Sequence, residues 1–246
     1  MDRFLYLSMS GAKEALRAQT SNNHNLANAS TTGFRANLEA FQTRAVAGSG
    51  HASRAYAIDA MTGWDETQGA LQSTGRDLDV GIQGPGWIAV QAADGREAYT
   101  RAGDLRIDPS GILMNGAGHP VLGDAGPVSI PPNASVMIGA DGTVSIVPIG
   151  SGPETMAQVG RIKLVNPPAQ ALARGEDGLF RQADGADAAP DANVRVVSGA
   201  LESSNVNVAN AMVKMIELSR QFDLQVKAMR TAEENAASSA QLLKST

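Results

Sequence analysis

Side chains that commonly carry out chemistry are sparse in this chain of 246 residues. Its three histidines, His24, His51 and His119, lie in separate regions, and none has the partner four residues away that a helical zinc motif requires. Asp77 and Asp79 are spaced as a carboxylate pair, but their position at the start of a predicted strand favours a solvated edge. There are no cysteines, which excludes disulfides, thiolate metal sites and a cysteine nucleophile. We therefore expect no catalytic, cofactor-binding or metal-ligating residues.

A glycine-rich segment at residues 84–89 matches G-x-G-x-x-A, the spacing of a dinucleotide-binding loop. In that fold the glycines must open a helix, whereas residues 87–91 continue as a predicted strand, so we reject the match. The sequence has neither the G-x-S-x-G nucleophile elbow nor the phosphate-binding G-x-x-x-x-G-K-[ST] loop. We expect no cofactor and no small-molecule substrate.

The overall composition excludes several classes of protein. Lys and Arg total 20 against 25 Asp and Glu, a net charge of -5, which argues against a nucleic-acid binder. Hydrophobic residues make up 43% of the chain and charged residues 18%, a balance typical of a globular protein. No apolar run approaches the roughly 18 to 20 residues that cross a bilayer. The beginning of the chain also lacks the pattern of a cleaved secretory signal.

Glycine and proline, which helix interiors exclude, divide the chain into regions. All 11 prolines and most of the 26 glycines lie in the middle of the chain, and residues 201–246 contain neither. This distribution predicts an α+β fold that is mainly β, with an all-β central domain between long terminal helices. The predicted regions are an N-terminal helix and turn at 1–35, an extended connector at 36–74, the all-β domain at 75–200 and a C-terminal helix at 201–246.

The two terminal segments carry apolar stripes. In the first, Leu5, Met9 and Leu16 follow helical spacing, and Gly33 is placed to end the helix in a left-handed conformation. In the last, residues 208–243 keep a strict alternation of four and three, the spacing of a coiled-coil seam, with Asn207 as the N-cap. Exposed apolar stripes are costly, so we expect the helices to pair as a coiled-coil-like layer, to pack on neighbouring molecules, or to do both.

The central region reads as short strands joined by tight turns. The pairs Asp94-Gly95 and Asp141-Gly142 stand between β-rich runs, as two-residue hairpin turns do. Residues 108–111, Asp-Pro-Ser-Gly, suit a type I turn. An all-β domain is therefore predicted, with barrel and sandwich both open.

Three segments resemble the signatures of one protein family. Residues 25–35, NLANASTTGFR, resemble the pattern N-I-A-N-x-N-T-x-G-[FY]-[KR]; residues 99–104, YTRAGD, resemble Y-T-R-x-G; and residues 199–207, GALESSNVN, resemble G-x-L-E-x-S-N-V-N. They occur in the order found in bacterial flagellar basal-body rod and hook proteins, so the chain resembles that family along its whole length. The opening MDRFLYLSMSGA resembles the proximal-rod branch more than the distal-rod branch.

This resemblance implies a structural role. The chain would be a self-assembling axial component of the proximal rod that transmits torque in motility, exported by the flagellar type III apparatus and assembled in the periplasm. Its partners would be other rod proteins, including the distal rod protein, and copies of itself, with no nucleic acid and no membrane span. The alternatives are a distal-rod or hook-type axial protein and, more remotely, a peptidoglycan hydrolase. A helix lying on a membrane is disfavoured because the C-terminal helix balances its basic and acidic residues.

Contacts between subunits are expected along both helices and at the asparagine-rich turn that joins the first helix to the rest of the chain. The amides of Asn25 and Asn28 can cap the helix or bond a neighbouring subunit, and we expect the second. The full set of expected interface residues is Leu5, Met9, Leu16, Asn25, Leu26, Asn28, Thr32, Gly33, Phe34, Asn205, Asn207, Met212, Met215, Phe222, Val226 and Met229.

Overall fold

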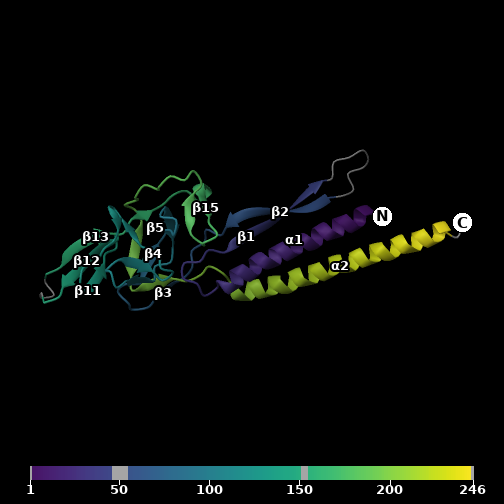
Figure 1. The fold of residues 1–246 in the computed structure, drawn as a ribbon. Coiled ribbons are helices and arrows are strands. Elements are labelled where there is room, and N and C mark those ends of the chain that lie inside the picture. The colour runs from purple at the N-terminus through teal and green to yellow at the C-terminus, as the bar shows by residue number, and fades with distance from the viewer. Residues whose placement is uncertain (1, 46–54, 151–154, 245–246) are drawn as a thin grey trace. The chain divides into compact units, whose positions relative to one another are not determined.

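The computed structural model describes residues 2–45, 55–150 and 155–244, and these residues form two compact units. The helical unit comprises the described parts of Met1–Ala29, Ala36–Asp65 and Val206–Thr246, and the β unit comprises Ser30–Arg35 and Glu66–Asn205. The fold is mainly β with two helices, as the distribution of glycine and proline predicts (Figure 1). No helix in the described part of the chain is both long enough and apolar enough to cross a membrane.

These units divide the chain differently from the regions predicted above. Residues 30–35, expected with the first helix, belong to the β unit. Residues 36–65, expected as part of an extended connector, belong to the helical unit and contain a hairpin. Proximity along the chain was a poor guide here, because long-range contacts decide which segments pack together. His51 lies outside the described residues.

The helical unit consists of two long helices and the hairpin. Helix α1 spans Asp2–Ala27 and α2 spans Val208–Lys244; they lie side by side and run antiparallel (Figure 1). Strands β1 (Asn37–Ala45) and β2 (Ala55–Trp64) pair in antiparallel register and contact α1. Asn207 caps α2 as predicted, because its Oδ1 accepts a hydrogen bond from the Asn210 backbone N–H at 3.0 Å.

Small side chains line the face of α1 that is buried in this unit. Ser8, Ala12, Ala15 and Ala18 are buried, and Asn22 donates a hydrogen bond from Nδ2 to the Ala211 carbonyl of α2 at 2.8 Å. Such short side chains let two helix backbones approach closely. Met9 and Leu16, which belong to the predicted apolar stripe, lie outside this buried face and are about half exposed.

The seam on α2 keeps the predicted four-three spacing in a different register. Its buried members are Ala211, Leu218 and Ala232, and the predicted residues Met215, Phe222 and Met229 lie between them, partly buried. Met212, predicted to lie in the seam, is exposed. The apolar stripe of α2 is wider than the surface that α1 contacts, so α1 covers only one side of the stripe.

The β unit is a set of small antiparallel sheets. Its largest sheet has the strand order β14-β5-β6-β16-β15, and a three-stranded sheet has the order β11-β12-β13. The remaining pairs in the described residues are β10-β9, β17-β4, β18-β3 and β7-β8. The bounds are β3 Leu71–Ser73, β4 Val80–Gln83, β5 Trp87–Gln91, β6 Glu97–Thr100, β7 Leu105–Ile107, β8 Leu113–Asn115, β9 Leu122–Gly123, β10 Gly126–Pro127, β11 Asn133–Ile138, β12 Thr143–Pro148, β13 Ala157–Arg161, β14 Leu164–Val165, β15 Leu172–Arg174, β16 Phe180–Gln182, β17 Arg195–Ser198 and β18 Ala200–Glu202, with a short 3-10 helix at Ala169–Ala171.

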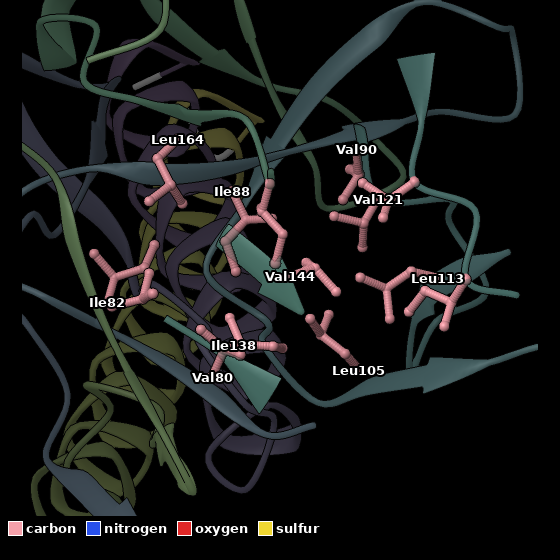
Figure 2. Packing of buried hydrophobic residues seen from close by; sticks show 14 of the residues in the cluster. Val80, Ile82, Ile88, Val90, Leu105, Leu113, Val121, Ile138, Val144 and Leu164 are labelled. Atoms are coloured by element: carbon pink, nitrogen blue, oxygen red, sulfur yellow. The ribbon is translucent and has the colours of Figure 1, made fainter. Parts of the chain in front are cut away.

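A single aliphatic core joins these sheets (Figure 2). Ile88, Leu105, Leu113, Val121 and Val144 are completely buried in it. With so few aromatic residues in the chain, valine, isoleucine and leucine supply most of the buried apolar surface. This core gives the β unit a hydrophobic interior of its own.

The predicted turns are present. Gly95 and Gly142 both adopt positive φ, at 81° and 83°, in the hairpins that join β5 to β6 and β11 to β12. The Asp108 carbonyl accepts a hydrogen bond from the Gly111 N–H at 3.0 Å, closing the turn between β7 and β8. These turns were readable from sequence because their geometry depends on neighbouring residues alone.

Candidate functional site

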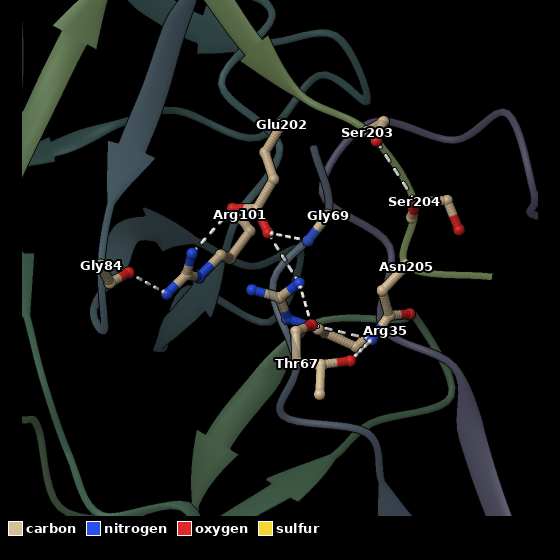
Figure 3. Close-up of polar contacts among 9 residues, drawn as sticks. All are labelled: Arg35, Thr67, Gly69, Gly84, Arg101, Glu202, Ser203, Ser204 and Asn205. Atoms are coloured by element: carbon tan, nitrogen blue, oxygen red, sulfur yellow. Dashed lines mark hydrogen bonds and ion pairs between the residues drawn. The ribbon is translucent and has the colours of Figure 1, made fainter. Parts of the chain in front are cut away.

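The three signature segments converge inside the β unit on one carboxylate, that of Glu202 at the end of β18 (Figure 3). Glu202 Oε1 lies 2.6 Å from Nη1 of Arg35, and Oε2 lies 2.7 Å from Nη1 of Arg101. Oε1 also accepts a hydrogen bond from the Gly69 backbone N–H at 3.0 Å. Each signature supplies one charged member of this group, which we call the Arg-Glu-Arg cluster.

Burial makes the cluster energetically demanding. The side chains of Arg35 and Glu202 are 1% exposed, and that of Arg101 is 4% exposed. Ionised groups taken out of water are stable only when paired and hydrogen-bonded. Backbone carbonyls supply the extra acceptors, because Arg35 donates to the Thr67 carbonyl and Arg101 donates to the Gly84 carbonyl, both at 2.7 Å.

The backbone around the cluster is joined as well. The Gly33 N–H donates to the Glu202 carbonyl at 2.8 Å, and the Asn205 N–H donates to the Phe34 carbonyl at 3.3 Å. Gly33 has φ of 65°, and a Cβ there would lie 2.3 Å from the Arg101 carbonyl carbon. Only glycine fits this close approach in the left-handed region. The entry segment, residues 30–35, is thus bound to the exit segment, residues 200–205.

Arginines and aromatic rings extend the site on one side. Arg101 lies over the Trp87 ring, with 5.5 Å from guanidinium carbon to ring centroid, and the Trp87 and Phe180 centroids are 4.5 Å apart. Arg174 lies 4.5 Å from the Phe34 centroid and 5.3 Å from that of Phe180. These distances suit cation–π contacts, which strengthen where water is excluded.

Burial in this site shifts the pKa values of two side chains, Arg174 and Tyr99. Burial lowers the pKa of Arg174, which also donates a hydrogen bond to the Arg35 carbonyl at 2.7 Å. Tyr99, in the second signature, accepts a hydrogen bond at its hydroxyl oxygen from the Ala188 N–H at 2.7 Å. Burial raises the pKa of Tyr99 to about 12, because the phenolate would lose its hydration. Tyr99 is therefore a neutral phenol at neutral pH.

This chemistry is that of a structural junction. Guanidinium groups stay protonated in proteins, so Arg35 and Arg101 are poor candidates for proton transfer. The Glu202 carboxylate is closed off by its own partners. Over the residues that the structure describes, no three or more histidine, aspartate or glutamate side chains gather as a metal site.

The expected interface residues fall into two groups, and those of the helices form the first. Met9, Leu16 and Met212 are exposed. The partly buried residues of this group are Leu5, Leu26, Met215, Phe222, Val226 and Met229.

The second group, at the turns, lies differently from expectation. Gly33 and Phe34 are buried within the β unit, and Thr32 is partly buried beside them. Asn205 donates from Nδ2 to the Thr67 carbonyl at 2.9 Å. These residues hold the entry and exit segments of their own chain, and their expected role between subunits stays a prediction.

Asn25 and Asn28 are also used within the chain. Asn25 makes two hydrogen bonds to the backbone of Asn37, donating to its carbonyl at 3.0 Å and accepting from its N–H at 2.8 Å. Asn28 donates from Nδ2 to the His24 carbonyl at 2.9 Å, which caps the end of α1. Both amides thus have hydrogen-bond partners within the chain, and the intermolecular role that we expected stays a prediction.

Arg35, Arg101 and Glu202 were absent from the expected site. Each stands inside a recognisable signature, and charged residues in such segments were the available signal. What the sequence did not show is that the three meet, because Arg101 and Glu202 are 101 positions apart. Local pattern carries no information on such a contact.

Two descriptions of known protein families match parts of this chain. The family description "Flagellar basal body rod FlgEFG protein C-terminal" matches residues 197–242, and "Flagellar hook protein FlgE/F/G D1 domain" matches residues 81–146. The first range contains Glu202 and the second contains Arg101. The chain belongs to the FlgE/F/G family of flagellar rod and hook proteins.

Full-length relatives narrow this class. The chain is 43% identical to the flagellar basal-body rod protein FlgF of Salmonella typhimurium and of Escherichia coli K12, in each case over 99% of both chains. It is 32% identical to the flagellar basal-body rod protein FlgG of Bacillus subtilis, over 95% of this chain and 96% of that one. The chain is a structural component of the proximal rod of the flagellar basal body, close to FlgF, and it is not an enzyme.

Proposed function

We propose that α1 and α2 form a coiled-coil-like layer in which this subunit docks onto its neighbours in the rod. The observation that carries the proposal is an apolar face of the helix pair that stays exposed. Met9 and Leu16 of α1 are about half exposed, as is Met212 of α2, while Ile216 is 69% exposed. A row of large apolar side chains in water is typical of a surface that binds another protein.

These residues occupy one side of the helix pair. Met9 and Leu16 each directly follow a buried residue of α1, and Met212 directly follows a buried residue of α2. One residue is a rotation of about 100° around a helix. The helices run antiparallel (Figure 1). An equal rotation away from the facing rows therefore carries both sets of residues to the same side. We call this side the open face.

The opposite side of α1 is already covered. Asn25 lies on that flank, and its two hydrogen bonds to Asn37 attach the beginning of β1. The open face instead carries a shallow groove lined by Gln19 of α1 and by Met215, Ile216, Ser219, Arg220 and Asp223 of α2. A groove that combines apolar side chains with polar and charged ones suits an amphipathic helix from a neighbouring subunit.

Membership of the family supports a proposed site of action. The subunit would be exported by the flagellar type III apparatus, assemble in the periplasm, and transmit torque as part of the rod. Its neighbours would be other rod proteins, including the distal rod protein, and copies of itself. Repeated head-to-tail contacts build open assemblies of this kind, and they leave each subunit with a surface that only the next one covers.

Charge on the open face tests the proposal. Ile216→Asp should leave the thermal unfolding of the isolated subunit within about 0.5 kcal/mol of the parent, as exposed substitutions usually do. In a strain whose chromosomal copy carries the change, rods should fail to assemble and swimming should be lost. Gln221→Asp, which adds the same charge at another exposed position of α2, is the matched control and should swim. Normal rods with Ile216→Asp would show that the open face faces solvent.

A further inference from the structure

The Arg-Glu-Arg cluster joins segments that become available at different times. Arg35 belongs to the entry segment, Arg101 follows β6 in the middle of the β unit, and Glu202 ends its last strand, β18. When a chain emerges N-terminus first, both arginines precede their shared acid. Until residue 202 arrives, neither guanidinium has the carboxylate that makes its burial favourable.

The same exit segment supplies the backbone partners of the entry segment. The Gly33 N–H and the Phe34 carbonyl are bonded to residues 202 and 205, respectively. The exit segment also binds the strand beside it, because β18 pairs with β3 and the Ser203 N–H donates to the Ala70 carbonyl at 2.9 Å. Both side-chain and backbone contacts of the entry segment therefore depend on one late stretch of chain.

We propose that Glu202 is a latch: its docking between Arg35 and Arg101 closes the entry and exit segments of the β unit together, as the last step of folding. Glu202 is a positioning residue, since it acts by holding these two segments. The latch fixes adjacent points at which the chain leaves the β unit, one shortly after α1 and one shortly before α2. The junction can close only once the exit segment, residues 200–205, is available. The latch concerns the isolated chain and does not rest on the open face.

The rest of the β unit has its own contacts. The Val128 N–H donates to the Val121 carbonyl at 2.9 Å in the aliphatic core, and no cluster member takes part in that bond. A second internal ion pair, Lys163 with Glu97, has an N–O distance of 2.7 Å and partly buried side chains. These groups supply a reference amide and a matched control for the loss of a buried carboxylate.

Amide hydrogen exchange on the purified full chain tests the latch. In Glu202→Gln, the Gly69 amide loses its charged acceptor, and the Gly33 and Ser203 amides lose the ion pairs that hold their segments together. All three should exchange at least about tenfold faster, while Val128 should not change. Glu97→Gln should leave Gly33 and Ser203 at parental rates. Uniform acceleration that includes Val128, or unchanged exchange at Gly33, would overturn the proposal.

Refolding of the parent chain tests the order without a variant. In pulse-labelled exchange, Gly33 and Ser203 should gain protection with one rate constant, slower than that of Val128. Gly33 protected before Ser203 would show that the entry segment docks without its acid. A single phase covering Val128 and Gly33 alike would show that closure is not a separate last step.

Discussion

The two units differ in how far their apolar side chains are removed from water. The β unit encloses a complete aliphatic core, and even its buried charges have partners within the unit. The helical unit keeps apolar side chains such as Met212 and Ile216 in contact with water. A unit with a buried core of its own can fold alone, whereas one with an uncovered apolar face is stabilised further by a partner. This difference is what the proposed docking of the helical unit in the rod requires.

The largest effect on stability is expected when one charge is removed from the Arg-Glu-Arg cluster of the β unit. Arg101→Leu leaves Glu202 with one guanidinium fewer and removes a hydrogen bond to Gly84, and it should lower the free energy of unfolding of the β unit by about 3–5 kcal/mol. The measurement is urea denaturation followed by tryptophan fluorescence, since Trp87 lies in this unit.

Arg96→Leu is the control for that change. Arg96 forms an exposed ion pair with Asp94, with its side chain 69% accessible, so the loss should stay below about 1 kcal/mol. Equal losses for the two variants would mean that the Arg-Glu-Arg cluster is no more important than a surface ion pair.

Truncating one large apolar residue in each unit compares them directly. Leu105 is completely buried, so Leu105→Ala should cost about 2–5 kcal/mol in the isolated subunit. Phe222 is only partly buried, so Phe222→Ala should cost less than Leu105→Ala in the isolated subunit and act mainly on rod assembly. Calorimetry of both variants, with a swimming assay, measures the contrast. A loss for Phe222→Ala as large as that for Leu105→Ala would mean that the helical unit is complete by itself.

Alanine substitutions at two glycines with similar backbone conformations test how tightly the entry segment is packed. Gly95→Ala meets open space at φ of 81°, so it should cost only the strain of the left-handed region, about 1–2 kcal/mol. Gly33→Ala has the same kind of strain and must also displace the Arg101 backbone, so its cost should be clearly larger. Denaturation curves of the two variants decide this, and equal costs would show that the entry segment yields easily.

The smallest expected effect is a dependence on alkaline pH. The pKa of Tyr99 is raised from 10.0 to about 12 in the folded chain, so folding favours the neutral phenol. Its contribution to stability is present below the unfolded pKa and is lost as the pH rises towards the folded value. Stability should therefore fall between about pH 10 and 12, and the fall should be smaller in Tyr99→Phe. The same slope in both proteins would assign it to other groups.

Features governed by neighbouring residues were largely predictable. The helices, the Asn207 cap, the hairpin turns at Gly95 and Gly142, and the mainly β centre all follow from local conformational preference. The family signatures were readable for a related reason, because they are short contiguous patterns.

The helix register and the charge cluster were decided by the tertiary structure alone. The four-three spacing of α2 fits more than one face, and the small side chains of α1 select Ala211 and Leu218 over Met212. Arg101 and Glu202 meet only because the sheets bring together positions far apart in the chain. Local preference determines how each segment coils or extends. Which surfaces meet depends on shape and burial summed over the whole chain, so it is settled only when the chain is packed.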